Sequence, residues 1–131
     1  MPPRLSRELE ILKRRYPDLG FVEAGWWILI PRYPLPNGWN RESSDTAFQV
    51  PIGYAGTPPY GFYVPSGLRF DGKKPDNYQE PAANKPPYEG EWGMFSWSID
   101  GTWRTPTTDF VGGESLNSFV LSFADRFGAG V

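Results

Sequence analysis

The segment Ile52-Gly53-Tyr54-Ala55-Gly56-Thr57-Pro58-Pro59-Tyr60-Gly61-Phe62-Tyr63-Val64 is the stretch that most constrains the fold of this chain. Proline fixes φ and removes a hydrogen-bond donor, so consecutive prolines belong in a turn and not in a strand ladder. We therefore expect Tyr54, Pro58 and Pro59 to shape a turn, with Phe62-Tyr63-Val64 as the strand that follows it.

Three further strands are predicted before this turn. Residues 46–52 place Thr46, Phe48, Val50 and Ile52 on one face of a half-buried strand. Residues 27–30 are rich in aromatic and β-branched side chains, and we expect that strand to break up at Pro31, Pro34 and Pro36. Residues 21–24 give a short first strand. Together the four strands predict an antiparallel meander.

A helix is predicted at each end of the chain. The first has apolar residues at helical spacing and cations between them, and it begins after Pro2-Pro3 and ends before Pro17. The second follows Gly112-Gly113, carries a phenylalanine-rich face, and has Gly128 where a C-cap glycine belongs. The apolar positions are Leu5, Leu9, Leu12 and Tyr16 in the first helix, and Leu116, Phe119, Val120, Phe123 and Phe127 in the second.

The order of these elements predicts an α+β fold. Residues 65–90 are rich in Pro, Gly, Asn, Asp and Lys, without periodicity, and are expected to form a long irregular loop of the kind that often carries function. The expected architecture is an N-terminal helix, a four-stranded sheet covered on one side, the loop and a C-terminal helix, in a single domain spanning residues 1–131.

The composition excludes several classes of function. Hydrophobic residues make up 39% and aromatic residues 17%, which excludes disorder through low hydrophobicity. The formal net charge of -2 offers no field for a phosphate backbone, so no nucleic-acid partner is expected. An apolar signal region is not evident, and the run at residues 26–30 is too short to cross a bilayer, so we expect a cytoplasmic protein without a membrane partner.

The chain contains neither cysteine nor histidine. These absences remove disulfides, thiolate metal sites, thiol nucleophiles, the usual general base and the commonest metal ligand. The Asp71-Gly72 and Asp76-Asn77 pairs offer too few converging oxygens for Ca²⁺. We expect no metal and no cofactor, and the catalytic possibilities are few.

The order of elements and the Tyr54-Ala55-Gly56-Thr57-Pro58-Pro59 turn resemble the ubiquitin-conjugating enzyme (E2, UBC-like) superfamily. That family carries a Tyr-Pro-x-x-Pro-Pro element here, and Ala55 replaces its first proline. Trp103-Arg104-Thr105-Pro106 looks like a stretched form of the family's Trp-Ser-Pro element, with Trp103 and Pro106 as the matching residues. The bacterial branch called prokaryotic E2 family E is the most similar, judging from Trp27-Ile28-Leu29-Ile30-Pro31, Gly53-Tyr54, Tyr60-Gly61-Phe62-Tyr63-Val64-Pro65 and Phe95-Ser96.

The resemblance implies membership of a bacterial transfer system. Its partners would be an E1-like activating enzyme, a ubiquitin-like modifier and often a metallopeptidase in the same pathway. In the family the first helix docks the activating enzyme, which implies a docking role here for Arg7, Lys13, Arg14 and Arg15. The alternative reading of these cations is a solvated helix face.

Two departures from the family pattern affect the chemistry. The His-Pro-Asn element is absent, and Asn84 lies too far from its position to replace the asparagine. At the position of the family cysteine, counted back from Trp103, the chain has Phe95 with Ser96 beside it. The resemblance therefore implies that Ser96 takes the modifier as an oxyester, with Ser98 as a less favourable second candidate.

A serine nucleophile without histidine needs another base. Asp100, Glu91, Glu89 or Asp109 would serve if burial raised the carboxyl pKa toward neutrality, or the activating enzyme would supply the base. The alternative reading is that Ser96 is a loop serine that makes local hydrogen bonds. Similarly, Trp92, Trp97 and Trp103 are either anchors in the core, which we favour, or an aromatic partner surface.

Three functions follow from this sequence. The first is an E2-like carrier that forms an oxyester on Ser96. The second is a catalytically inactive E2 variant that holds the modifier or the activating enzyme without a covalent bond. The third, a carbohydrate- or peptide-binding β-protein, explains the aromatic content but not the order of the elements.

Overall fold

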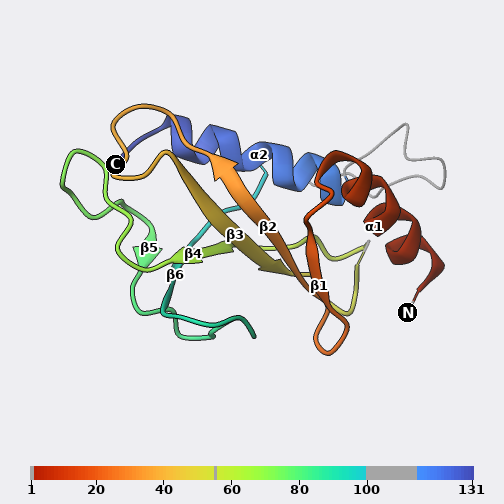
Figure 1. The fold of residues 1–131 in the computed structure, drawn as a ribbon. Helices are drawn as coiled ribbons and strands as arrows, with labels where there is room; N and C mark the ends of the chain where they lie inside the picture. Colours follow the sequence, from red (N-terminus) through yellow and green to blue (C-terminus); the bar gives the residue numbers. More distant parts are fainter. Residues whose placement is uncertain (1, 55, 100–114) are drawn as a thin grey trace.

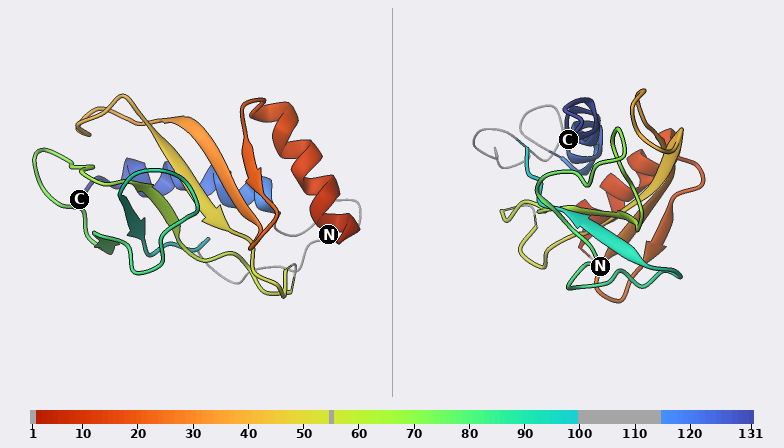
Figure 2. Two further views of the ribbon diagram at one scale, coloured as in Figure 1. Left: turned by 60° about the horizontal axis from the view of Figure 1, so that its bottom comes forward. Right: turned by 90° about the vertical axis from the view of Figure 1, so that its left-hand side faces the viewer.

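The computed structural model describes residues 2–54, 56–99 and 115–131. Its elements are α1 (Pro3–Arg15), β1 (Gly20–Val22), β2 (Trp27–Pro34), β3 (Ser43–Gln49), β4 (Phe62–Pro65), β5 (Tyr78–Gln79), β6 (Trp92–Phe95) and α2 (Leu116–Gly128). Figures 1 and 2 show α1 beside β1 and α2 running across the sheet. The α+β architecture with a helix at each end is confirmed.

The predicted antiparallel meander of β1, β2, β3 and β4 is confirmed, but it is incomplete, because two further strands extend the sheet to six within the described residues. The strand order is β1-β2-β3-β4-β6-β5, and β4 pairs with β6 because the intervening chain turns back to place β5 at the outer edge. The predicted irregular loop therefore contains β5. Its main chain also pairs through isolated bridges from Phe70 to Trp39 and to Lys73.

Three predicted boundaries need correction. The strand β2 continues through Pro31, where a register shift between Ile30 and Tyr33 accommodates the proline as β-bulges do, and it ends at Pro34, one of the predicted positions. The strand β3 ends at Gln49, which leaves Ile52 91% exposed instead of on the buried face. At the other end of the chain, α2 includes Gly128, and the glycine with positive φ is Gly130.

Both faces of the sheet are covered, one by the helices and the other by a loop. The leucines of α1 and the phenylalanines of α2 form one core with alternate residues of β2, β3, β4 and β6. On the opposite face, Trp27, Ala47, Tyr63 and Trp92 form a smaller cluster, against which Ala82 and Tyr88 pack. The expectation that only one side is covered is therefore incomplete.

Candidate functional site

Ser96 lies directly after β6 and is exposed, whereas the preceding Phe95 is completely buried. The change from buried to exposed occurs where the strand leaves the core. Ser96 is therefore accessible to solvent, which is the first requirement for the role implied by the resemblance.

The main chain on either side of the Ser96 side chain is fixed by hydrogen bonds. The Ser96 N–H donates to the carbonyl of Asn77 at 2.8 Å, and the Gly61 N–H donates to the carbonyl of Trp97 at 2.7 Å. Asn77 adopts a φ of 55° and Gly61 a φ of 76°, conformations that asparagine and glycine tolerate best. The exposed serine therefore stands on a constrained backbone.

Two buried polar residues of α2 support this backbone from inside the protein. Ser122 and Arg126 lie four positions apart and so share one side of the helix. The indole Nε1 of Trp97 donates to Ser122 Oγ at 3.0 Å. The Arg126 guanidinium donates to the carbonyl of Asp76 at 2.9 Å and lies 4.7 Å from the centre of the Phe95 ring.

Arg126 is a buried cation, 6% exposed, and no ion pair is found for it among the described residues. Its second hydrogen bond goes to the carbonyl of Gly130 at 2.7 Å. Burial lowers the pKa of Arg126, and the negative charge of Asp76 opposes that shift. Two carbonyl dipoles and the Phe95 ring face therefore compensate the charge.

Two of the four carboxylates predicted as bases lie within the described residues, and the other two lie outside them. Glu89 and Glu91 precede β6, and the strand alone spans about 10 Å, so they lie at the opposite end of it from Ser96. Asp100 and Asp109 lie outside the described residues. Among the described residues, the segment bonded to Ser96 is the main chain of Asn77, whose carbonyl accepts the Ser96 N–H.

The turn residue Tyr54 has a structural role that links three parts of the chain. Its hydroxyl donates to Glu8 Oε1 at 2.9 Å, and the same oxygen accepts the Leu116 N–H at 2.7 Å. Glu8 is 2% exposed, and its other oxygen accepts a hydrogen bond from Arg4 Nε at 3.1 Å. Burial, followed by the charge of Glu8, raises the pKa of Tyr54.

The other residues predicted to be functional are packed in the protein, exposed on its surface, or outside the described residues. Pro58 is half-buried and Pro59 is buried, while Trp92 and Trp97 pack against the two cores. Arg7, Lys13, Arg14 and Arg15 are exposed on α1, and Ser98 is exposed beyond β6. Trp103 and Pro106 lie outside the described residues, so the stretched Trp-x-x-Pro match stays a prediction.

Three buried polar residues that hold these segments in place, namely Glu8, Ser122 and Arg126, were not predicted from the sequence. The helical pattern of the sequence indicated a buried position for each of them. Glu8 interrupts the apolar spacing of α1, and Ser122 and Arg126 lie at i, i+4 within the phenylalanine-rich side of α2. A polar residue on the buried stripe of an amphipathic helix requires a hydrogen-bond partner, which each of these residues has.

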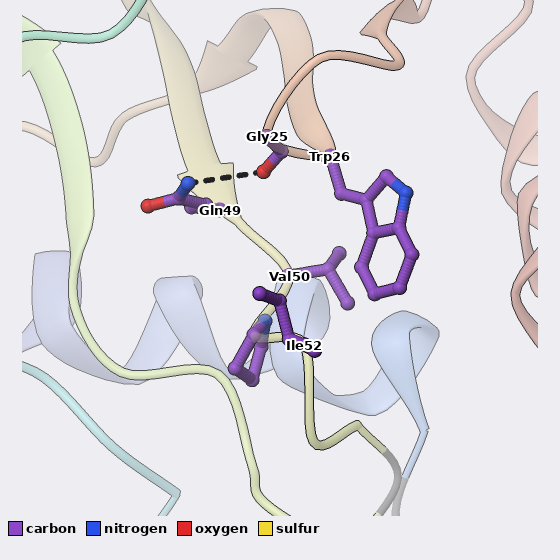
Figure 3. Close-up of a pocket in the computed structure, with 6 residues that line it drawn as sticks. Gly25, Trp26, Gln49, Val50 and Ile52 are labelled. Atoms are coloured by element: carbon purple, nitrogen blue, oxygen red, sulfur yellow. Dashed lines mark hydrogen bonds between the residues drawn. The ribbon is translucent and has the colours of Figure 1, made fainter. Parts of the chain in front are cut away.

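A hollow lies between the β1–β2 turn and the chain leaving β3 (Figure 3), and Ser96 is not among the residues that line it. It encloses about 570 Å³ and is lined by Gly25, Trp26, Gln49, Val50, Pro51 and Ile52. We call it the Trp26 pocket. Its lining carries no charge. The Gln49 amide donates to the carbonyl of Gly25 at 3.0 Å, a bond that Figure 3 marks with a dashed line.

The Trp26 pocket is constrained by its backbone. Trp26 adopts a φ of 54°, which is uncommon for a bulky residue, and the Val50 N–H donates to its carbonyl at 3.0 Å. Such strained positions occur frequently at binding and active sites. The pocket is therefore a second candidate site, suited to an apolar group.

Comparison with protein-family models, curated proteins and solved structures gave no match. The described helices include none that is long and apolar enough to cross a membrane.

Proposed function

We propose that this chain is a cytoplasmic, E2-like carrier of a ubiquitin-like modifier in a bacterial transfer pathway, and that Ser96 holds the modifier as an oxyester. The observation that carries the proposal is the exposed Ser96 on a backbone fixed at Asn77 and Gly61. The α+β arrangement, which is consistent with the UBC-like fold, supports it.

In the proposed reaction, Ser96 Oγ attacks the C-terminal carbonyl of the activated modifier. The hydroxyl proton passes to a base, the C–O ester bond forms, and the bond to the activating enzyme breaks with its electrons leaving on that enzyme. An acceptor nucleophile then attacks the ester carbonyl, and Ser96 leaves and regains a proton. The candidates for the base are Asp100 and a group of the activating enzyme.

Intact-mass analysis with the candidate activating enzyme, ATP and modifier tests the covalent step. The wild type is expected to gain the mass of the modifier, and hydroxylamine is expected to remove it. Ser96→Ala should gain nothing, whereas the control Ser98→Ala, another exposed serine of the same segment, should gain the mass as the wild type does. An adduct that survives Ser96→Ala would refute the assignment of Ser96.

The proposed docking of the activating enzyme rests on the exposed cations Arg7, Lys13 and Arg14 of α1. Charge reversal at Lys13 and Arg14 is expected to slow transfer several-fold, and added salt should slow the wild type in the same way, since exposed charges are screened. Reversal of Lys85, an exposed cation outside α1, provides the control. A metallopeptidase of the same pathway would act on the product and not on this docking face.

The second candidate function is a non-covalent binding module that holds the modifier or the activating enzyme. The Trp26 pocket favours it, because an uncharged hollow beside the almost fully exposed Ile52 suits an apolar side chain of a partner. Titration of modifier without ATP tests this function. Ile52→Asp should abolish binding and Ser96→Ala should preserve it, whereas equal binding by both variants would exclude this pocket.

A further inference from the structure

The main chain of Asn77 lies directly opposite that of Ser96. The carbonyl of Asn77 accepts the Ser96 N–H at 2.8 Å, which extends the antiparallel register of Tyr78 with Phe95 by one residue. Residues that face each other in such a hydrogen-bonded pair have Cα atoms about 5.5 Å apart. The side chain of Asn77 therefore begins within one side-chain length of Ser96.

Both side chains are available to a ligand. Asn77 and Ser96 are exposed. Within the described part of the chain, neither the Asn77 carboxamide nor Ser96 Oγ makes a hydrogen bond to another residue. A free amide donor and a free hydroxyl are thus carried on two paired segments of main chain.

Other asparagines of this part of the chain are already engaged. Asn40 uses both polar atoms of its carboxamide in hydrogen bonds to main-chain groups of the β4–β5 connection, each at 2.8 Å. The Asn84 side chain is hydrogen-bonded to Tyr63, a member of the smaller cluster. These two carboxamides hold the fold, whereas that of Asn77 does not.

The backbone conformation of Asn77 does not by itself require asparagine. Its φ is 55°, a value that glycine, asparagine and aspartate adopt most readily. Glycine would supply no side chain, and an ionised aspartate only accepts hydrogen bonds. Asparagine is the one of the three that gives this position an uncharged N–H donor.

Such a donor meets a need of the reaction proposed for Ser96. When Ser96 Oγ attacks the carbonyl of the modifier, the carbonyl oxygen gains a negative charge. N–H groups aimed at this oxygen stabilise the transition state, and amide side chains serve in this way in acyl transfer. The amide of Asn77 is the donor that the described residues bring beside Ser96.

We propose that Asn77 is a catalytic residue of the carrier reaction, whose Nδ2–H donates to the carbonyl oxygen bound at Ser96. This inference rests on the carrier function proposed above. The oxygen becomes negative when Ser96 attacks, and again when the acceptor attacks the ester. Each time the carbonyl double bond re-forms as the leaving group departs, and Asn77 transfers no proton.

Asn77→Gly removes the donor and keeps a residue that tolerates positive φ. Intact-mass measurements over a single turnover with charged activating enzyme follow adduct formation. The variant is expected to be slower by about tenfold to a hundredfold, less than for a donor in an enclosed site, because Asn77 is exposed to water. Its urea midpoint should stay close to that of the wild type.

Asn77→Asp is nearly isosteric and keeps the test valid if Asn77→Gly unfolds. It replaces the donor with a carboxylate that repels the developing charge, so it should be at least as slow as Asn77→Gly. The control Gln79→Glu adds the same charge at an exposed position opposite Met94, and it should react like the wild type.

Cleavage of the accumulated oxyester by hydroxylamine tests the same oxygen without the activating enzyme. Asn77→Gly should slow this cleavage by a factor similar to its effect on adduct formation. Equal rates for wild type and Asn77→Gly in both measurements would overturn the role of Asn77 and leave the carrier function standing. A wild type that gains no modifier from a charged activating enzyme would overturn the carrier function, and the role of Asn77 with it.

Discussion

The guanidinium of Arg126 donates a hydrogen bond of 2.9 Å to the main-chain carbonyl of Asp76, fifty positions away in the sequence. The next residue, Asn77, accepts the N–H of Ser96. Through these two hydrogen bonds, α2 holds the segment of Asp76 and Asn77, to which the main chain of the exposed Ser96 is bonded. Arg126 is therefore a positioning residue for the proposed site.

Arg126→Ala is expected to lower the free energy of unfolding by about 2 to 3 kcal/mol, because the carbonyls of Asp76 and Gly130 lose a charged donor. Urea denaturation at neutral pH measures the change. Lys85→Ala, which removes an exposed cation, should alter stability by less than about 0.5 kcal/mol. Equal effects of the two substitutions would show that the buried contacts of Arg126 contribute nothing net.

Tyr54→Phe is expected to cost about 1.5 to 3 kcal/mol, the range for a hydrogen bond to a charged group. The buried carboxylate of Glu8 would lose one donor while keeping the Leu116 N–H and Arg4. Thermal and urea unfolding of the variant measure the loss. Tyr60→Phe provides the matched control, since Tyr60 is 61% exposed, and a Tyr54 variant as stable as this control would contradict the role of the hydroxyl.

The helices were predictable from the sequence because their buried residues are local and periodic. Leu5, Leu9 and Leu12 on α1, like the phenylalanines of α2, carry the spacing that burial of one helix face requires. The strands β5 and β6 were not predicted, because they are short and their pairing is not local. Two residues of β5 carry no periodicity, and their pairing with Phe95 and Met94 is defined only in the folded sheet.

The candidate site was predictable only in part. Sequence reasoning located Ser96 through a resemblance, but the bonds that align it come from Asn77, Gly61 and α2, which are far away along the chain. Ile52 was misplaced because the alternation of residues 46–52 continues past the last paired residue, Gln49. The alternation of polar and apolar residues does not show at which residue the pairing of two strands ends.

Ile28→Ala and Ile52→Ala form a pair that tests the corrected strand boundary. Ile28 is completely buried in β2, and its truncation should cost about 2 to 5 kcal/mol. Ile52 is 91% exposed, so its truncation should change stability by less than about 0.5 kcal/mol. Urea denaturation of both variants is the measurement, and a large loss for Ile52→Ala would restore the longer strand.

Glu80 makes the stability of the chain depend on acid pH. Hydrogen bonds from Arg69 first, and then from the Gly67 N–H and the Tyr78 hydroxyl, lower the pKa of Glu80 from 4.5 to about 2, although partial burial acts in the opposite direction. The Arg69 bond to Glu80 measures 2.8 Å, and the Gly67 and Tyr78 bonds 2.7 Å each. The folded state therefore favours the ionised carboxylate.

Because the folded pKa is depressed, the stabilisation by Glu80 is complete above pH 4.5 and is lost as the pH falls toward about 2. Glu80→Gln should be less stable than the wild type at neutral pH, and the two unfolding free energies should converge across this interval. Urea midpoints measured from pH 7 to pH 2 give the comparison. The exposed Glu42→Gln is the control, and a constant gap between wild type and Glu80→Gln over the whole range would show that the Arg69 bonds do not favour ionisation of Glu80.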